Sequence, residues 1–346
     1  MSTHLDFTNL RKDFPVLERQ VHGHPLVYLD NAATSLKPWP VIRAIERYFT
    51  HDTANIHRGV HFLSEEGTRQ YEETRKSVCS FINAKNTSEI IFTKGTTESI
   101  NLVAQSWGIN FLKTDDVVLL STLEHHSNIV PWQLTAQKVG ASVVEIPITR
   151  EGDIDLVAYT KLLTQYGNKV KMVAITHISN GIGTVNPIKK MIDLAHQAGA
   201  LFLVDGAQAI AHTSVDVQKL DCDFYVFSAH KALGPTALGV LYGKEALLEK
   251  IPPYQGGGDM INIVTFAKTT YNDLPHKFEA GTPPIAEGIA FKAALEYLQH
   301  LGLEKIATYE QTLTLYALER LNDIPTVQII GNHQERSAIV SLTMKG

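Results

Sequence analysis

Short runs of β-branched and apolar residues alternate with helical patterns between about residues 88 and 243. The runs predict seven strands: EIIFT (89–93), VVLLS (117–121), SVVEIP (142–147), KMVAITHIS (171–179), ALFLVDG (200–206), DFYVFS (223–228) and LGVLYG (238–243). The clearest crossover is a helical pattern that Pro187 opens and Gly199 stops, directly before the next strand. Strands that alternate with helices form a parallel sheet with helices on its faces. We therefore predict an α/β fold with a mainly parallel central sheet.

The character of the chain changes after residue 251. Residues 252–284 are rich in Pro, Gly and polar residues and form too long a segment for an ordinary connection, so we expect this loop to serve a site or an interface. Helical patterns follow at 285–302 and 304–321, the second with a stripe made of Ile306, Tyr309, Leu313 and Tyr316. IPTVQIIG and SAIVSLTMKG then predict two strands of a small sheet, and we expect the second to find its partners in later sequence.

Composition excludes several classes of protein. The 346 residues are 44% hydrophobic and 19% charged, which is ordinary for a globular protein and excludes a disordered chain. With 36 acidic and 31 basic residues the net charge is -5 and no basic block is present, so we expect no nucleic-acid partner. Apolar stretches are far shorter than a membrane helix, and MSTHLDFTNLRKDF has no apolar signal core. We predict a cytoplasmic protein without a membrane partner.

The two cysteines form neither a disulfide framework nor a four-ligand metal site. Cys79 lies in a helical pattern that predicts its burial. Cys222 lies between Asp221 and Asp223, which disfavour a thiolate. We expect neither to be a poised nucleophile.

Ligands of open α/β sheets bind outside the carboxyl ends of the strands. Polar groups follow five of the predicted strands at that end: Lys94–Glu98, Glu124–Asn128, Asn180, Asp205–Gln208 and Ser228–Lys231. This regularity predicts one ligand site along the sheet edge.

Three of these groups have a specific chemistry. Gly95, Thr96 and Thr97 open a helix with free N–H groups and hydroxyls, which suits a phosphate, although a simple helix cap is the alternative. Asp205 ends a buried strand and needs a cationic partner such as a protonated pyridine nitrogen, unless it merely caps a helix. Lys231 stands near His230, and a lysine beside other cationic groups is a usable nucleophile toward a carbonyl, whereas most lysines are only solvated.

The histidines could serve a metal or an aromatic ring. His125 and His126 are adjacent, and His57 and His61 have a helix-like spacing, but a zinc-binding H-E-x-x-H motif is absent. An imidazole can instead stack on a cofactor ring or carry protons, and a purely structural role stays open. We expect no metal.

The sequence closely resembles the class V aminotransferases of fold type I, and among them the group II cysteine desulfurases and selenocysteine lyases. The motifs that carry the resemblance are YLDNAAT (28–34), HRGVHFLS (57–64), GTTESINLVA (95–104), EHHSNIVPWQ (124–133), THISNGIGT (176–184), VDGAQA (204–209), DFYVFSAHKALGPT (223–236), GGGDMI (256–261) and FEAGTPP (278–284). The resemblance implies a fold type I transferase with a small, here incomplete, α+β C-terminal domain. It implies three regions: an N-terminal segment of the small domain (1–25), a large pyridoxal-phosphate domain (26–284), and bridging helices that lead into the small domain (285–346).

The resemblance also implies pyridoxal 5'-phosphate as the cofactor and a role for each site residue. Lys231 would form the Schiff base and move protons at the substrate Cα, and His125 would stack on the ring. Asp205 would pair with the pyridine nitrogen, Gln208 would bond the ring hydroxyl oxygen, and Asn180 would lie near that oxygen and the substrate carboxylate. The phosphate would be held by Thr96, Thr97, Ser228, His230 and Thr282, the last of which would reach across a dimer interface.

One departure from the family affects the expected function. The family has a reactive cysteine and a carboxylate-binding arginine that belong after SAIVSLTMKG, so we expect these 346 residues to be part of a longer chain, poorly soluble alone and weak in sulfide release. The function implied is a homodimeric cysteine desulfurase that converts L-cysteine to L-alanine and passes sulfur to an acceptor protein for iron-sulfur cluster or other sulfur biosynthesis. The alternatives are a selenocysteine or cysteine sulfinate lyase, and an inactive fragment that binds the cofactor.

Overall fold

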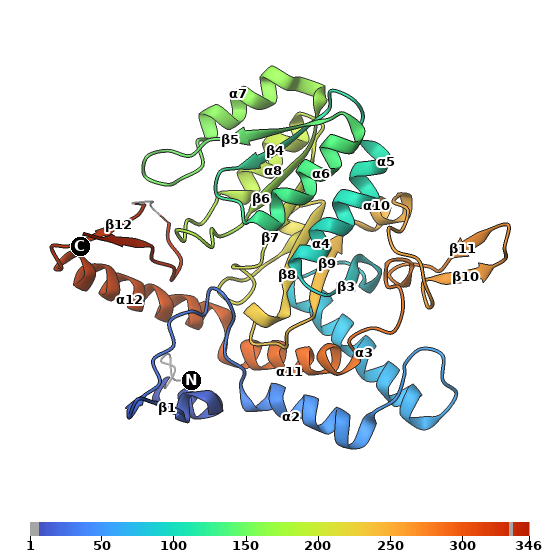
Figure 1. The fold of residues 1–346 in the computed structure, drawn as a ribbon, viewed down its shortest axis with the longest axis horizontal. Coiled ribbons are helices and arrows are strands. Elements are labelled where there is room, and N and C mark those ends of the chain that lie inside the picture. Colours follow the sequence, from blue (N-terminus) through green and yellow to red (C-terminus); the bar gives the residue numbers. More distant parts are fainter. Residues whose placement is uncertain (1–6, 332–334, 346) are drawn as a thin grey trace. The chain divides into compact units, whose positions relative to one another are not determined.

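The computed structural model describes residues 7–331 and 335–345 (Figure 1). Expectations that concern residues 1–6, 332–334 and 346, which include parts of the predicted 1–25 and 285–346 regions, lie outside the described residues. The chain divides into two compact units: residues 1–95 with 228–305 form the first, and residues 96–227 with 306–346 form the second. Seven strands make up a mixed central sheet. The predicted α/β fold is confirmed.

The second unit contributes five parallel strands in the order β5-β4-β6-β7-β8. Their bounds are β4 Val117–Ser121, β5 Ser142–Ile146, β6 Val170–Thr176, β7 Leu201–Asp205 and β8 Phe224–Ser228. All residues of β4 and β8 are buried, as expected for parallel strands covered on both faces. β6 ends three residues earlier than predicted, because the Thr176 hydroxyl donates to the Ile178 carbonyl at 2.8 Å and turns the chain.

The second unit also contains α-helices (Figure 1). They include α4 Thr96–Val103, α5 Ile109–Phe111, α6 Val130–Val139, α7 Leu156–Tyr166, α8 Ile188–Gln197 and α9 Val217–Leu220. Of these, α6 and α7 contact β5, and α8 contacts β7. The predicted crossover helix is α8, which begins after Pro187 and stops before Gly199, where φ is +79°. Asp155 caps α7 by accepting the N–H groups of Val157 and Ala158, each at 2.9 Å. No helix in the described part of the chain is long and apolar enough to cross a bilayer.

The first unit contributes the antiparallel pair β3 (Ile90–Thr93) and β9 (Gly239–Gly243). α11 packs against both α2 and α3, and Figure 1 shows α11 and α2 side by side. The helices of this unit are α1 Phe7–Leu10, α2 Trp39–Arg47, α3 Phe62–Phe81, α10 Glu245–Lys250 and α11 Ile285–Leu301. A small hairpin, β1 (Gln20–Val21) with β2 (His24–Pro25), lies near its start.

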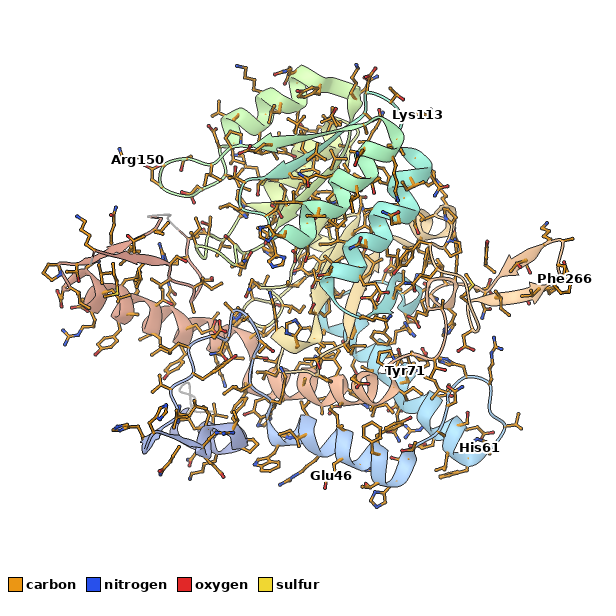
Figure 2. The ribbon with its side chains drawn as sticks, viewed as in Figure 1. Glu46, His61, Tyr71, Lys113, Arg150 and Phe266 are labelled. Carbon is orange, nitrogen blue, oxygen red and sulfur yellow. The ribbon has the colours of Figure 1, made fainter. Side chains whose placement is uncertain are left out.

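The long loop predicted at 252–284 contains a hairpin of its own. β10 (Ile261–Val264) pairs with β11 (Thr269–Tyr271), and Figure 2 shows the exposed Phe266 at the tip. Gly281 N–H donates to Gly258 O at 2.9 Å, so the FEAGTPP motif is tied to the GGGDMI motif.

The C-terminal part of the chain differs from two expectations. α12 (Leu303–Asn322) has the predicted extent, but Leu313 and Tyr316 of its predicted stripe are 48% and 61% exposed, and Thr314 is buried instead. β13 (Leu342–Met344) pairs antiparallel with β12 (Val327–Ile329), so one partner of the SAIVSLTMKG strand is the earlier strand of the predicted small sheet. Two strands of a small sheet are confirmed, but residues 337–340 are not part of them.

Candidate active site

The second unit gathers most of the predicted site residues at one edge of its sheet. β4, β6 and β7 are parallel neighbours, so their carboxyl ends lie together. His125 follows β4, Asn180 follows β6, and Asp205 is the last residue of β7. α4 of the same unit begins at Thr96. The residues at this edge of the sheet are therefore the ones that the sequence places after the ends of these strands.

Asp205 is held in place by the turn that follows it. The side chain is 3% exposed, and its Oδ1 accepts the Ala207 N–H at 2.9 Å. Gly206 allows this turn to pack on Tyr225, since a Cβ at residue 206 would lie 2.1 Å from the Tyr225 ring. The Tyr225 hydroxyl lies 3.1 Å from Nδ1 of His177, whose pKa is lowered to about 4 by burial. His177 is therefore neutral near pH 7 and does not provide a positive charge for Asp205.

Gln208 and Asn180 occupy two short turns of the same unit. Gln208 is 5% exposed and lies in the turn in which Gly206 O accepts the N–H groups of Ala209 and Ile210. Asn180 is half-buried and follows Ser179, whose Oγ accepts the N–H groups of Gly181 and Ile182 at 3.3 Å. Both side chains are thus carried on turns with fixed backbones.

His125 is oriented by Ser127 and linked through it to α4. Nδ1 of His125 accepts the Ser127 N–H at 3.1 Å and lies 3.0 Å from Ser127 Oγ. That Oγ lies 2.8 Å from Oγ1 of Thr97. The predicted ring-stacking residue His125 and one of the predicted phosphate-binding residues, Thr97, are therefore linked through Ser127.

Glu124, which the sequence analysis places among the strand-end groups without a role of its own, anchors the loop that carries His125. It is 7% exposed and accepts hydrogen bonds from Ser121 Oγ, from Asn128 Nδ2 at 2.7 Å and from the Thr176 N–H at 3.1 Å. Burial raises the pKa of Glu124 to about 8, against the opposite effect of these donors. The signal available in the sequence was a charged residue at the end of an apolar strand, as at Asp205.

Ser228, the last residue of β8, already belongs to the first unit, which also carries His230 and Lys231 in the 3-10 turn that follows. Gly95, the residue before α4, lies close to Ser228, because a Cβ on Gly95 would be 3.4 Å from Ser228 Oγ. A Cβ on Gly239 would lie 2.3 Å from the Gly95 Cα, so only glycine permits this backbone approach. The backbones of Gly95 and Gly239 are therefore in direct contact, and the Ser228 hydroxyl lies beside Gly95.

Thr282, predicted to reach a second protomer, is exposed and follows Gly281, where φ is +80°. The preceding residues of its loop are fixed by a buried ion pair. Arg75 is 1% exposed and donates to Glu279 at 2.7 and 2.9 Å, and Oε1 of Glu279 also accepts the Phe92 N–H. The loop is thereby attached to α3 and β3.

His57 and His61 do not share a helix face, contrary to their helix-like spacing. His57 lies before α3 with φ +69°, and His61 caps α3. His57, Glu72 and His276 instead place ligand atoms within 4.8 Å of one another. Glu72 already accepts Arg75 Nε at 2.9 Å. Because this guanidinium would repel a cation, we interpret the cluster as part of the Arg75 ion-pair network.

Neither cysteine lies in a position suited to nucleophilic attack on a substrate at the predicted site. Cys79 is half-buried rather than fully buried as predicted, donates to Ala84 O at 3.3 Å, and has its pKa raised by burial and by Glu89. Cys222 is 0% exposed at the entry of β8, the end of the strand opposite to Ser228.

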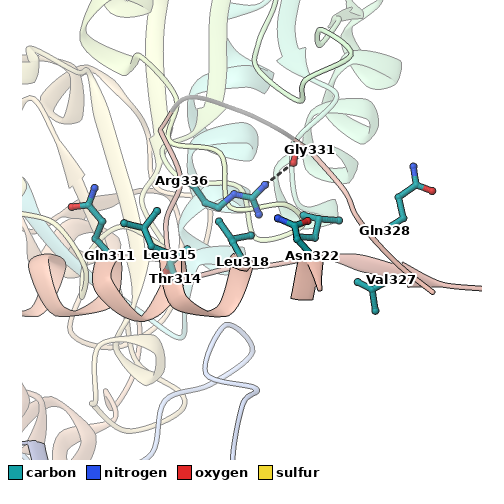
Figure 3. A pocket seen from close by; sticks show the side chains of 10 residues that line it. Gln311, Thr314, Leu315, Leu318, Asn322, Val327, Gln328, Gly331 and Arg336 are labelled. Carbon is teal, nitrogen blue, oxygen red and sulfur yellow. Dashed lines mark hydrogen bonds between the residues drawn. The ribbon is translucent and has the colours of Figure 1, made fainter. Parts of the chain in front are cut away.

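A cavity of about 520 Å³ in the second unit lies away from the predicted residues (Figure 3). α12, β12 and Arg336 line it, and Arg336 donates to Gly331 O at 2.7 Å. None of the predicted site residues lines this cavity.

Comparison with known proteins gives the class of this chain. Residues 27–346 match the family described as aminotransferase class-V. A cysteine desulfurase of Shigella flexneri is 49% identical over 97% of the chain and 82% of its own length. One of Synechococcus elongatus is 47% identical over 99% of the chain but only 54% of its own length, so the chain spans about half of that relative. The solved apo structure of a cysteine desulfurase from Thermococcus onnurineus is 37% identical and has a TM-score of 0.93, covering 100% of this chain and 84% of its own.

The chain belongs to the class V aminotransferase family. Within that family it belongs with the cysteine desulfurases, as the resemblance of its motifs predicted. The predicted cofactor agrees with this placement. A more distant fold neighbour, C-DES, has a TM-score of 0.83 at 22% identity, and a mutant of C-DES was solved with glycine covalently linked to the PLP cofactor.

Proposed function

We propose that this chain is the cofactor-binding and substrate-activating part of a pyridoxal-phosphate-dependent cysteine desulfurase, which converts L-cysteine to L-alanine. The observation that carries the proposal is the row of polar groups at the carboxyl ends of parallel strands, which includes the buried Asp205. Membership of the cysteine desulfurase family supports the same substrate. The sulfur acceptor, an iron-sulfur cluster pathway and a cytoplasmic location stay predictions of the sequence.

The chemistry of the donor set fits the cofactor. Asp205 supplies a buried carboxylate for a protonated pyridine nitrogen, and burial favours such a pairing because an isolated charge is costly there. Gly95 and Ser228, which lie close together, would hold the phosphate with Thr96, Thr97, His230 and Thr282. Gln208 would donate to the ring oxygen, with Asn180 beside it. When bound, pyridoxal phosphate supplies an electron sink for charge that develops at the substrate Cα.

Lys231 and His125 are the residues proposed to move protons. The Lys231 Nζ would attach the cofactor and then transfer the proton at the substrate Cα. His125 would stack on the cofactor ring, and its Nε2 would carry the mobile proton, because Nδ1 is occupied as an acceptor by the Ser127 N–H. Asn180 would orient the substrate carboxylate.

A lyase that acts on selenocysteine or cysteine sulfinate is the second candidate. The observation that favours it is that Cys222 is buried and Cys79 is half-buried with a raised pKa, since such a lyase needs a nucleophilic cysteine less than a desulfurase does. The residues assigned to the cofactor would be the same.

A homodimer is part of the proposal. Its support is the exposed Thr282 on a loop that the buried Arg75–Glu279 pair fixes in position, a suitable arrangement for a residue offered to a second protomer. Light scattering at micromolar concentration tests this point. A stable monomer with full cofactor occupancy contradicts it.

The test of the function is product analysis with the cofactor-loaded protein, dithiothreitol, and L-cysteine, selenocysteine or cysteine sulfinate in parallel. Alanine from cysteine with stoichiometric sulfide supports the desulfurase. Alanine from selenocysteine or sulfinate alone supports the lyase. Bound cofactor without alanine from any of the three leaves only a cofactor-binding protein and contradicts both.

A further inference from the structure

Four donors of the segment Thr34–Lys37 meet at the carbonyl oxygen of His230. This oxygen accepts the Ser35 N–H at 3.1 Å, the Ser35 hydroxyl at 2.8 Å, the Lys37 ammonium at 2.8 Å and, more weakly, the Thr34 hydroxyl at 3.3 Å. A carbonyl ordinarily has two lone pairs to share, so this oxygen is unusually heavily bonded. The peptide that it belongs to joins His230 to Lys231.

The same segment also binds the other side of the 3-10 turn that carries Lys231. Ser35 Oγ accepts the Leu233 N–H at 2.9 Å, and Thr34 Oγ1 lies 3.2 Å from Nδ1 of His230. The turn is therefore held both before and after Lys231 by residues about 195 positions earlier in the chain.

Lys37 is the charged member of this arrangement. Its Nζ donates to Ser35 O at 2.6 Å, to Ser35 Oγ at 3.3 Å and to His230 O. Among the ion pairs of the described residues none involves Lys37, so its charge is balanced by neutral oxygens rather than by a carboxylate. Burial lowers the pKa of Lys37 to about 8. A half-buried ammonium without an acid is costly, which argues for a role beyond solvation.

We propose that Lys37 is a positioning residue for Lys231: its ammonium fixes the His230 carbonyl and so orients the peptide that presents the lysine to the cofactor. This inference rests on the proposed function, because it assumes that Lys231 is the residue that attaches pyridoxal phosphate. It adds a residue that lies outside the set predicted from the sequence.

The charge of Lys37 gives the proposal a readout that needs no turnover. The pKa of His230 is lowered by burial and then by the nearby charges of Lys231 and Lys37. Removal of the Lys37 charge therefore raises the pKa of His230, which side-chain ¹⁵N NMR follows in the cofactor-free protein. Lys37→Met is the variant, Lys37→Arg keeps the charge, and Lys76→Met removes an exposed lysine of α3 as the control.

The second readout is the rate at which added pyridoxal phosphate becomes covalently attached, trapped by borohydride and located at Lys231 by peptide mapping. We expect Lys37→Met to slow attachment about tenfold, Lys37→Arg to recover most of that rate, and Lys76→Met to match the wild type, in line with the loss of one charge-assisted hydrogen bond. Should Lys37→Met not fold, Ser35→Ala removes a different donor to the same carbonyl and is expected to slow attachment likewise.

An unchanged His230 pKa together with an unchanged attachment rate in Lys37→Met overturns the inference. The inference is also contradicted if Lys37→Arg slows attachment as severely as Lys37→Met does. In that case the positive charge and the N–H donors at residue 37 do not determine the attachment rate. Failure of the proposed function looks different. In that case the wild-type protein attaches the cofactor at Lys231 normally and yields no alanine.

Discussion

Nδ1 of His125 accepts the backbone N–H of Ser127 at 3.1 Å. A backbone N–H can only donate, so this ring nitrogen carries no proton and the neutral imidazole is the Nε2–H tautomer. The Ser127 hydroxyl, 3.0 Å from the same nitrogen and 2.8 Å from Thr97 Oγ1, makes the ring and the start of α4 one unit. The neutral tautomer of a residue proposed to move protons is thus set by its own loop.

The first prediction is that this tautomer is observed directly. Long-range ¹H–¹⁵N spectra of the cofactor-free protein should show a protonated Nε2 at His125, and Ser127→Ala should preserve it because the N–H remains. The same variant should weaken phosphate binding by Thr97, raising the cofactor dissociation constant about fivefold, which corresponds to roughly 1 kcal/mol for one hydrogen bond. Ser127→Thr keeps the hydroxyl and is the matched control. A protonated Nδ1 contradicts the assignment.

The second prediction concerns Lys231. Lys231→Ala should lose the visible absorption of the covalently bound cofactor while far-UV circular dichroism and the melting temperature stay near wild type, because the turn is held by backbone contacts of Ser35 and by the Lys37 ammonium. Lys94→Ala, at another strand end, is the control. The same visible band in Lys231→Ala would show that another lysine attaches the cofactor.

The third prediction concerns Asp205. Asp205→Asn keeps an oxygen for the Ala207 N–H, so the fold should be retained. It removes the charge proposed to hold the pyridine nitrogen protonated, and alanine formation should fall about 100-fold or more, the scale seen when one preorganised electrostatic group is lost. Cofactor content, measured by absorbance after denaturation, separates a loss of chemistry from a loss of binding. Normal turnover in Asp205→Asn contradicts this role.

The fourth prediction is a stability effect at the Arg75 network. Arg75→Met leaves the carboxylates of Glu72 and Glu279 without their guanidinium and should lower the free energy of unfolding by about 3–5 kcal/mol. Arg69→Met, an exposed arginine of the same helix, should change it far less. Denaturant unfolding of the two variants measures this difference. Equal losses of unfolding free energy in Arg75→Met and Arg69→Met would contradict the prediction.

The fifth prediction gives the pH dependence of that network. Burial alone would raise the pKa of Glu72, but hydrogen bonds from His57 and Arg75 lower it to about 2. A carboxylate with a depressed folded-state pKa stabilises the fold above its unfolded value of about 4.3, and the stabilisation is lost as the pH falls toward 2. Wild-type unfolding free energy should therefore drop between pH 5 and 2 more steeply than that of Glu72→Gln. Parallel curves for the two proteins would exclude this contribution.

The strands and the candidate residues could be predicted from the sequence because both depend on local pattern. Parallel strands buried on both faces give continuous apolar runs, and a polar residue directly after such a run, as at Asp205, marks a strand end at a ligand-binding edge. Membership of the cysteine desulfurase family was predictable for the same reason, since its motifs are contiguous.

The supporting contacts could not be predicted, because they join residues far apart in the chain. Lys37 meets His230 across 193 positions, and Arg75 meets Glu279 across 204. Single-sequence patterns carry no information on such pairs. The predicted stripe of α12 shows a second limit of sequence patterns. The spacing of Leu313 and Tyr316 places them on one face of the helix, but it does not say whether another element covers that face, and both side chains are exposed.

The loop that carries Asn180 is bound along its length by the chain's last described residues. Val185 N–H donates to Glu335 O at 3.1 Å, Ser337 N–H donates to Gly183 O at 2.9 Å, and the Ser341 hydroxyl donates to Gly181 O. Gly183 has no room for a side chain, since a Cβ there would lie 2.5 Å from Ile339 O. Asn180 is proposed to orient the substrate carboxylate, so the segment 335–341 would support that role through this loop. By reciprocity, the factor by which displacement of the segment changes substrate affinity equals the factor by which bound substrate opposes the displacement.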